Sequence, residues 1–237
     1  MASGKTIAVV GNPNSGKTTL FNGLTGSNQR IGNWPGVTVE KKEGTVVLNG
    51  REMTLVDLPG IYSLSAHSED ERVARDYILS GEPGLVVNIL DATNLERNLY
   101  LTLQLLEMGV PVLAVVNMMD LAAAKAIEID LEQLQAKLGI PVLGISATKS
   151  KEVQSVKEAI ARFRRDKPDS RFRIDYPAEI ETVISQWTPA LGKVARDLGA
   201  NERWTALKIL EQDPWVTEKV IQSGVLSESD IKTAISR

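Results

Sequence analysis

The chain has 237 residues, of which 43% are hydrophobic and 24% charged, and its formal net charge is −3. This length accommodates one α/β domain with a smaller appendage, and the negative charge argues against a nucleic-acid partner. The chain has no cysteine and one histidine, which excludes disulfides, thiolate metal sites and histidine clusters. No apolar stretch is long enough to span a membrane, so we expect this chain to be soluble.

The first predicted elements are a strand at 6–10, a loop and a helix at 16–25. The loop matches the phosphate-binding pattern G-x-x-x-x-G-K-[ST], in which backbone N–H groups and a helix N-terminus surround a phosphate. Lys17 is expected at the β- and γ-phosphates, and the Thr18 hydroxyl at Mg²⁺. The residues expected at the phosphates are Gly11, Asn12, Pro13, Asn14, Ser15, Gly16, Lys17, Thr18 and Thr19.

Two antiparallel strands are predicted at 38–48 and 51–57, at one edge of the sheet, because Asn-Gly at 49–50 is a strong hairpin signal. The second strand ends in Asp57-Leu58-Pro59-Gly60. In a nucleotide site, an aspartate at that place holds Mg²⁺ through a water, and the glycine N–H bonds the γ-phosphate. We interpret the acidic residues at 69–71 as part of a mobile, solvated loop.

The remainder of the first 166 residues alternates short apolar runs with helical patterns. Strands are predicted at 85–90, 112–117 and 142–145, and helices at 95–108, 130–138 and 151–166. The strands show little alternation, as expected of parallel strands covered on both faces. Repeated βα units of this kind predict a doubly wound, mostly parallel α/β sheet.

Base recognition is predicted at two loops that follow successive strands. The Asp120 carboxylate would accept from guanine N1–H and the 2-amino group, which adenine cannot offer, and the backbone of Ser146-Ala147-Thr148 would place N–H groups near guanine O6. We therefore expect GTP rather than ATP. The residues expected at the base are Asn117, Met118, Asp120, Ser146, Ala147 and Thr148.

After a polar linker at 166–177 the pattern is helical without strands. Apolar residues at 180, 183, 184 and 187 form one helical face, and further helices are predicted at 201–211, 215–222 and 228–236. Trp187, Trp204 and Trp215 are expected to fill the core of a small all-α bundle. We divide the chain into a GTPase domain at 1–167 and a linker with a helical domain at 168–237.

The motifs at 11–18, 57–60, 117–120 and 146–148, with the segment 32–40, make five motifs in the order found in the translation-factor-related branch of small GTPases, which residues 6 to 166 resemble. The segments 32–40 and 94–107 are very similar to the ferrous iron transport protein B family of bacterial iron-uptake membrane proteins, as is Met118, where most GTPases carry a lysine. A thioether can cover the guanine face by dispersion.

This resemblance implies a GTP-binding, slowly hydrolysing switch domain that regulates Fe²⁺ uptake. It would lie at the cytoplasmic face of the bacterial inner membrane, joined to the membrane transport domain of the same polypeptide, which this chain lacks. The helical domain would slow GDP release. Whether copies of the chain associate stays open.

The resemblance also implies roles in the first switch and in catalysis. Thr38, after Gly36 and Val37, would be the switch threonine that reaches Mg²⁺ alongside Thr18 and Asp57, although a threonine also simply opens strands. Many GTPases orient water with a glutamine where this chain has Ile61. A K⁺ ion held by Asn14 and the carbonyls of Gly32 and Trp34 would supply the missing charge. The catalytic set is then Asn14, Lys17, Thr38 and Gly60.

Simpler explanations remain for some of these residues. Asn14 is also a residue type that tolerates left-handed turns. A ribosome-assembly GTPase is a rival interpretation, but residues 178–237 hold nine acidic and seven basic side chains, a net of −2 that suits phosphate binding poorly. A nucleotide-gated interaction module with incidental hydrolysis stays open, because Ile61 offers no hydrogen bond.

Overall fold

A computed structural model describes residues 6–26, 28–163 and 172–235. The chain forms two compact units, the first made of Met1–Leu106 and Val110–Phe172, the second of Glu107–Gly109 and Arg173–Arg237. Across the described residues, no helix has both the length and the apolar content needed to cross a membrane.

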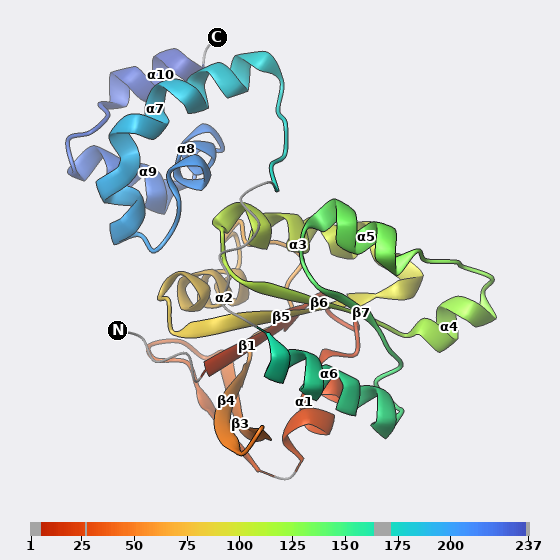
Figure 1. The fold of residues 1–237 in the computed structure, drawn as a ribbon. Coiled ribbons are helices and arrows are strands. Elements are labelled where there is room, and N and C mark those ends of the chain that lie inside the picture. The colour runs from red at the N-terminus through yellow and green to blue at the C-terminus, as the bar shows by residue number, and fades with distance from the viewer. Residues whose placement is uncertain (1–5, 27, 164–171, 236–237) are drawn as a thin grey trace. The chain divides into compact units, whose positions relative to one another are not determined.

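The first unit is built on a seven-stranded sheet in the order β2-β3-β4-β1-β5-β6-β7 (Figure 1). The strands are β1 (Thr6–Gly11), β2 (Gln29–Asn33), β3 (Glu40–Leu48), β4 (Arg51–Asp57), β5 (Pro83–Asp91), β6 (Val112–Asn117) and β7 (Val142–Gly144). β3 runs antiparallel to both β2 and β4; β1 pairs in parallel with β4 and β5, and β6 with β5 and β7. The predicted mostly parallel α/β fold is confirmed.

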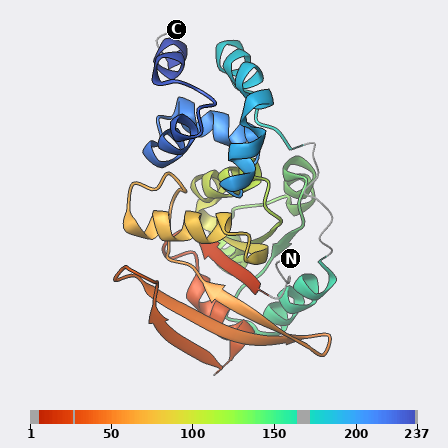
Figure 2. The ribbon, with the colours of Figure 1, turned by 90° about the vertical axis from the view of Figure 1, so that its left-hand side faces the viewer.

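The predicted hairpin is present, but it lies one strand in from the edge. β3 and β4 pair through a turn in which Asn49 and Gly50 have φ of 50° and 74°, as a type I′ turn requires. The edge strand is instead β2, which pairs with β3 and can be followed in Figure 2 beside the hairpin. The sequence Gln29–Asn33 is mostly exposed and lacks an apolar alternation, so it carried no strand signal.

Helices cover both faces of the sheet. They are α1 (Lys17–Thr25), α2 (Glu69–Leu79), the 3₁₀ helix η1 (Ala92–Asn94), α3 (Leu95–Met108), α4 (Met119–Ala124), α5 (Leu131–Leu138) and α6 (Ser150–Arg162). Figure 1 shows α1 and α6 on one face and α2, α3 and α5 on the other. The predicted bounds of α3 are confirmed; the part of the predicted last helix beyond Phe163 lies outside the described residues.

The acidic residues at 69–71 were wrongly assigned to a loop, because they form the first turn of α2. Ser68 is the N-cap, and its hydroxyl accepts a hydrogen bond from the Glu71 N–H at 3.1 Å. Three acidic side chains at a helix N-terminus complement the helix dipole, which explains why this charged stretch is ordered into a helix.

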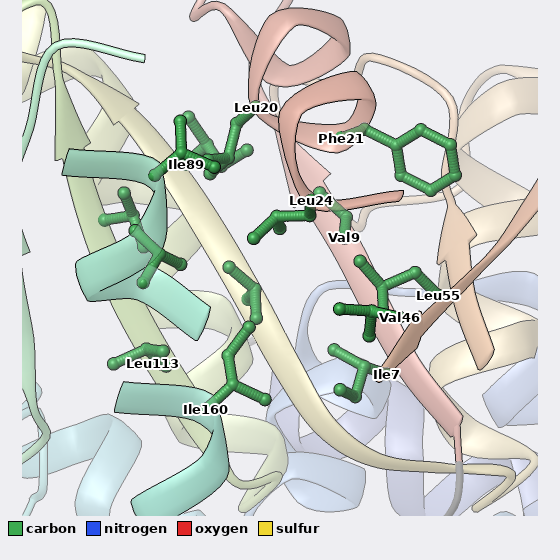
Figure 3. Close-up of a cluster of buried hydrophobic side chains, with 14 of the residues drawn as sticks. Ile7, Val9, Leu20, Phe21, Leu24, Val46, Leu55, Ile89, Leu113 and Ile160 are labelled. Carbon is green, nitrogen blue, oxygen red and sulfur yellow. The ribbon is translucent and has the colours of Figure 1, made fainter. Parts of the chain in front are cut away.

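A hydrophobic core cluster lies between the sheet and the pair α1 and α6 (Figure 3). Leu20 and Phe21 of α1 are fully buried, and with Ile160 of α6 they belong to the same cluster as Ile7 and Val9 of β1. This packing fixes the start of α1 at the end of β1. The loops that follow β1, β4, β6 and β7 all leave the sheet at the strands' carboxyl ends, where open α/β sheets bind ligands.

The second unit contains, among its described residues, α7 (Ala178–Asp197), α8 (Glu202–Leu210), α9 (Pro214–Gln222) and α10 (Glu228–Ile235). Trp187 and Trp204 are buried as predicted, whereas Trp215 is only half-buried. A reciprocal cap opens α10: the Asp230 N–H donates to the Ser227 hydroxyl, and the Ser227 N–H donates back to the Asp230 carboxylate.

Candidate nucleotide site

The phosphate loop has the backbone shape that an anion cradle needs. Asn14 and Gly16 both adopt left-handed conformations, with φ of 66° and 83°, and α1 begins directly afterwards at Lys17. Successive N–H groups in such a turn point inward, and the helix N-terminus adds a positive partial charge. Asn14 is exposed, so the turn accounts for its backbone while its amide remains accessible.

Asn117 connects the phosphate loop to the loop after β7. Its buried amide donates from Nδ2 to the Ser15 carbonyl at 2.9 Å and accepts at Oδ1 from the Ala147 N–H at 2.8 Å. A Cβ atom at Gly16 would lie 2.1 Å from Asn117 Nδ2, so only glycine fits against this bridge. Asn117 therefore braces the site. The Ala147 N–H, one of those expected near guanine O6, donates to Asn117 in this structure.

Lys17 and Asp57 form an ion pair between the phosphate loop and the end of β4. The Asp57 carboxylate is 6% exposed, and burial raises its pKa, with Lys17 opposing that shift. Thr18 is exposed at the start of α1. A hydroxyl and a carboxylate are the hard oxygen ligands that Mg²⁺ prefers, so these residues fit that ion.

Gly60 lies against the phosphate loop, as its expected role requires. A Cβ built at Gly60 would be 3.4 Å from Pro13 Cα, and the Ile61 N–H donates to the Gly11 carbonyl at 3.2 Å. Leu58 is anchored in the same way by its N–H to the Val9 carbonyl. Pro59 and Gly60 thus pass alongside the loop, and the Ile61 side chain is buried at 2% exposure.

The two loops expected at the base lie side by side. The Asp120 N–H donates to Ser146 Oγ at 3.2 Å, and hydrogen bonding with the Ser146 side chain lowers the pKa of Asp120, which keeps its exposed carboxylate ionised. Met118 precedes α4 in a left-handed conformation with φ of 64°. Met118 and Asp120 of the loop after β6 thus lie at the same end of the sheet as Ser146 of the loop after β7. Thr148 follows two residues later in the second loop.

Glu152 is a site residue that sequence reasoning missed. Its carboxylate accepts from the Ser146 N–H and lies 3.0 Å from Lys149 Nζ, so it fixes both ends of the loop after β7. The Ser146 N–H, with Lys149, lowers the pKa of Glu152. Its only signal in the sequence was an acidic residue in the first turn of a helix.

The first switch is anchored by one aromatic side chain. Trp34 is 8% exposed, its ring meets that of Tyr77 edge-on at 4.9 Å, and Lys41 Nζ lies 4.7 Å from its centre. The Trp34 carbonyl, expected at K⁺, accepts from the Val37 N–H at 3.3 Å. Gly32, Gly36 and Thr38 are exposed, and within the described residues the Thr38 hydroxyl makes no hydrogen bond.

The second switch, residues 58–68, is held by three side chains to which the sequence analysis gave no such role. Gln104 Oε1 accepts from the Leu64 N–H at 2.7 Å, and the Arg97 guanidinium lies 4.1 Å from the centre of the Tyr62 ring. Glu71 accepts from the Ser63 hydroxyl and the His67 N–H. All three residues come from helices α2 and α3, where polar positions look like solvated faces until the partner is known.

Two family models match the chain in succession. The one described as ferrous iron transport protein B matches residues 5–160, and the one described as FeoB cytosolic helical domain matches residues 176–237. The Fe(2+) transporter FeoB of Escherichia coli strain K12 is 44% identical over 213 residues, which cover 88% of this chain and 27% of that protein. That of Salmonella typhimurium strain LT2 is 43% identical with the same coverage. The chain therefore spans 27% of the length of these curated relatives.

Solved structures of two other bacterial proteins are similar over almost the whole chain. A GDP-bound mutant of the S. thermophilus FeoB G-domain is 42% identical, with a TM-score of 0.85, covering 98% of this chain and 86% of that one. The cytosolic domain of T. maritima FeoB in a GMPPNP form is 39% identical, with a TM-score of 0.85, covering 98% and 92%.

Proposed function

The chain belongs to the ferrous iron transport protein B family of P-loop GTPases, and from that premise we propose that it binds GTP and hydrolyses it to GDP and phosphate. The observation that carries this proposal is the Asn117 bridge. One buried amide holds the phosphate loop and the loop after β7 together, so phosphate and base contacts are presented as a single site.

Hydrolysis follows from what these residues do when a nucleotide binds. The backbone N–H groups of the phosphate loop hold the β- and γ-phosphates, and Lys17 moves from Asp57 to the phosphate oxygens. Mg²⁺ held by Thr18, Thr38 and Asp57 would neutralise the charge there. The Gly60 N–H bonds the γ-phosphate while a water oxygen attacks phosphorus and the bond to the bridging oxygen breaks; the water releases one proton to solvent, leaving GDP and inorganic phosphate.

Guanine selectivity rests on the ionised Asp120. Its carboxylate can accept two hydrogen bonds from guanine, and Asp120→Asn removes the charge and turns one acceptor into a donor. Calorimetric titration should show GDP bound far more tightly than ADP, and the variant should lose about 2–4 kcal/mol of that preference. Asp130→Asn, at the exposed cap of α5, is the matched control. Equal binding of GDP and ADP by the unmodified chain would contradict the proposal.

We propose that K⁺ completes the catalytic charge, because the Ile61 side chain is buried and apolar. Asn14, with the carbonyls of Gly32 and Trp34, would hold the ion. GTP turnover should be faster in K⁺ than in Na⁺, and Asn14→Gly should abolish that difference while keeping the left-handed turn. Asn49→Gly, in the hairpin turn, is the control. A K⁺ response that survives Asn14→Gly would rule out this ligand.

The helical domain is proposed to slow GDP release, with the boundary between domains near residue 168. This chain covers a quarter of its full-length relatives, so regulation of Fe²⁺ uptake, a membrane domain in the same polypeptide and a place at the cytoplasmic face of the bacterial inner membrane are proposals from the family. Deletion of residues 168–237 should speed GDP release in stopped-flow measurements without abolishing binding; an unchanged rate would leave the helices as a spacer.

A further inference from the structure

We propose that α3 is the template on which the second switch is set for hydrolysis, with Gln104 and Arg97 as positioning residues. The inference rests on the proposed GTPase activity and assigns a use to the segment 94–107, which no step above employs. Four polar contacts are involved: two fix α3 to β5, and two fix the second switch to α3.

Besides packing through its apolar face, α3 is joined to β5 by hydrogen bonds between buried polar groups. Asn88 of β5 donates to the Thr102 hydroxyl at 2.7 Å, and both residues are at most 1% exposed. At the start of the helix, Asn98 accepts from the Asp91 N–H at 3.2 Å. Buried hydrogen bonds of this kind fix one register, because sliding the helix would leave their groups unpaired. α3 is therefore a fixed reference for whatever is attached to it.

The second switch is attached to one face of this helix. Arg97, Leu101 and Gln104 are spaced by four and three residues, which places them in line along α3. Leu101 is fully buried between the two polar contacts, and the attached residues are Tyr62 and Leu64. Two attachment points on alternate residues define the path of the chain from 62 to 64.

That path continues without a gap to the phosphate loop. Ile61 is held by its N–H to the Gly11 carbonyl, and Gly60 lies against Pro13. Along the chain, Gly60 is followed by one anchor on the phosphate loop, at Ile61, and then by two anchors on α3, at Tyr62 and Leu64. Loss of an α3 anchor leaves the Ile61 hydrogen bond with less support, so the arrangement that bonds the γ-phosphate becomes a smaller fraction of the population.

Gln104 supplies the first test. Gln104→Met keeps the length of the side chain and removes the acceptor, leaving the Leu64 N–H buried and unpaired. We expect kcat for GTP to fall about tenfold, with KM and GDP affinity within about twofold of the unmodified protein. Gln104→Glu retains an acceptor oxygen and should restore most of kcat, while Gln133→Met on the exposed face of α5 is the control.

Two results for the Gln104 variants would contradict this positioning role. If kcat is unchanged in Gln104→Met, or if Gln104→Glu loses as much kcat as Gln104→Met, the contact does not position the switch. Failure of the proposed function is a different result, in which the unmodified protein itself does not turn over GTP in K⁺ buffer.

Arg97 supplies a second test that does not depend on a buried side chain. Arg97 and Tyr62 are exposed, so Arg97→Ala and Tyr62→Ala should both fold, and each should lower kcat by roughly two- to fivefold. If Arg97 acts through Tyr62, the double variant loses no more than either single variant. Tyr62→Phe keeps the ring and should behave as the unmodified protein. Additive losses in the double variant would show that Arg97 and Tyr62 act independently, which would contradict a positioning role for Arg97 through Tyr62.

Discussion

In the first switch, residues 32–40, only Trp34 is buried, whereas in the second, residues 58–68, Leu58, Ile61 and Leu64 are all at most 2% exposed. The first is held by one ring and two backbone hydrogen bonds; the second is held by Gln104, Glu71 and the phosphate loop. Regions with few buried contacts open at low free-energy cost. The first switch is thus built to move and the second to stay in register.

The largest difference is expected from matched truncations in the two switches. Leu64→Ala removes a fully buried side chain and should lower the free energy of unfolding by about 2–5 kcal/mol. Val37→Ala, in the half-buried part of the first switch, should change it by about 0.5 kcal/mol or less. Urea unfolding with unchanged m-values measures both free energies. Equal losses in the two variants would contradict the difference in packing between the two switches.

Trp34 tests whether the first switch has a single anchor. Trp34→Ala should cost about 2 kcal/mol of stability and speed hydrogen exchange of the amides at 33–39. Trp34→Phe should cost much less, because it keeps the ring contact with Tyr77 and removes a buried indole N–H that has no hydrogen-bond partner among the described residues. Slow exchange at 33–39 in Trp34→Ala would mean that other contacts hold this loop.

Glu71 tests the outer end of the second switch. Glu71→Ala removes the acceptor of the Ser63 hydroxyl and the His67 N–H, and should cost about 1 kcal/mol. Exchange should quicken at 63–68 and stay slow at 58–61, which is held by β1 and the phosphate loop. Asp70→Ala, in the same first turn of α2 but exposed, is the control. Faster exchange across all of 58–68 would show that the second switch opens as one piece.

The smallest effect is expected from the carboxylate of Asp57, the residue before the second switch. Burial raises the pKa of Asp57, so in the folded protein the charged form is disfavoured relative to the unfolded chain. This group therefore favours folding at low pH, and its contribution is lost as the pH rises through its folded pKa. Without nucleotide or Mg²⁺, Asp57→Asn should melt no lower than the unmodified protein at pH 7, with the gap closing towards pH 4. A variant that melts markedly lower at pH 7 would show that the Lys17 pair outweighs burial.

The sequence predicted best those features whose chemistry lies in contiguous residues. The phosphate loop and the run that ends at Gly60 are each a short motif between recognisable elements, and α3 was predicted to the residue because its apolar periodicity is uninterrupted. The mostly parallel sheet follows from the repeated βα units.

Other features escaped prediction because they depend on partners far along the chain. Gln104 and Leu64 are forty residues apart, and nothing in either neighbourhood marks the contact. β2 exists only because β3 offers it an edge, and α2 begins in a charged stretch whose capping at Ser68 was overlooked. Asn117 was singled out as a base contact, and its bracing role required the fold.

The Asn117 bridge spans 102 residues of sequence and holds the loop proposed to bind the base in place relative to the phosphate loop. A ligand that engages both loops gains a chelate effect, since once one half is bound the other arrives at high effective concentration. Guanosine and inorganic pyrophosphate offered separately would lack that advantage. We therefore expect the protein to discriminate between ligands by the length of the linkage between base and phosphates.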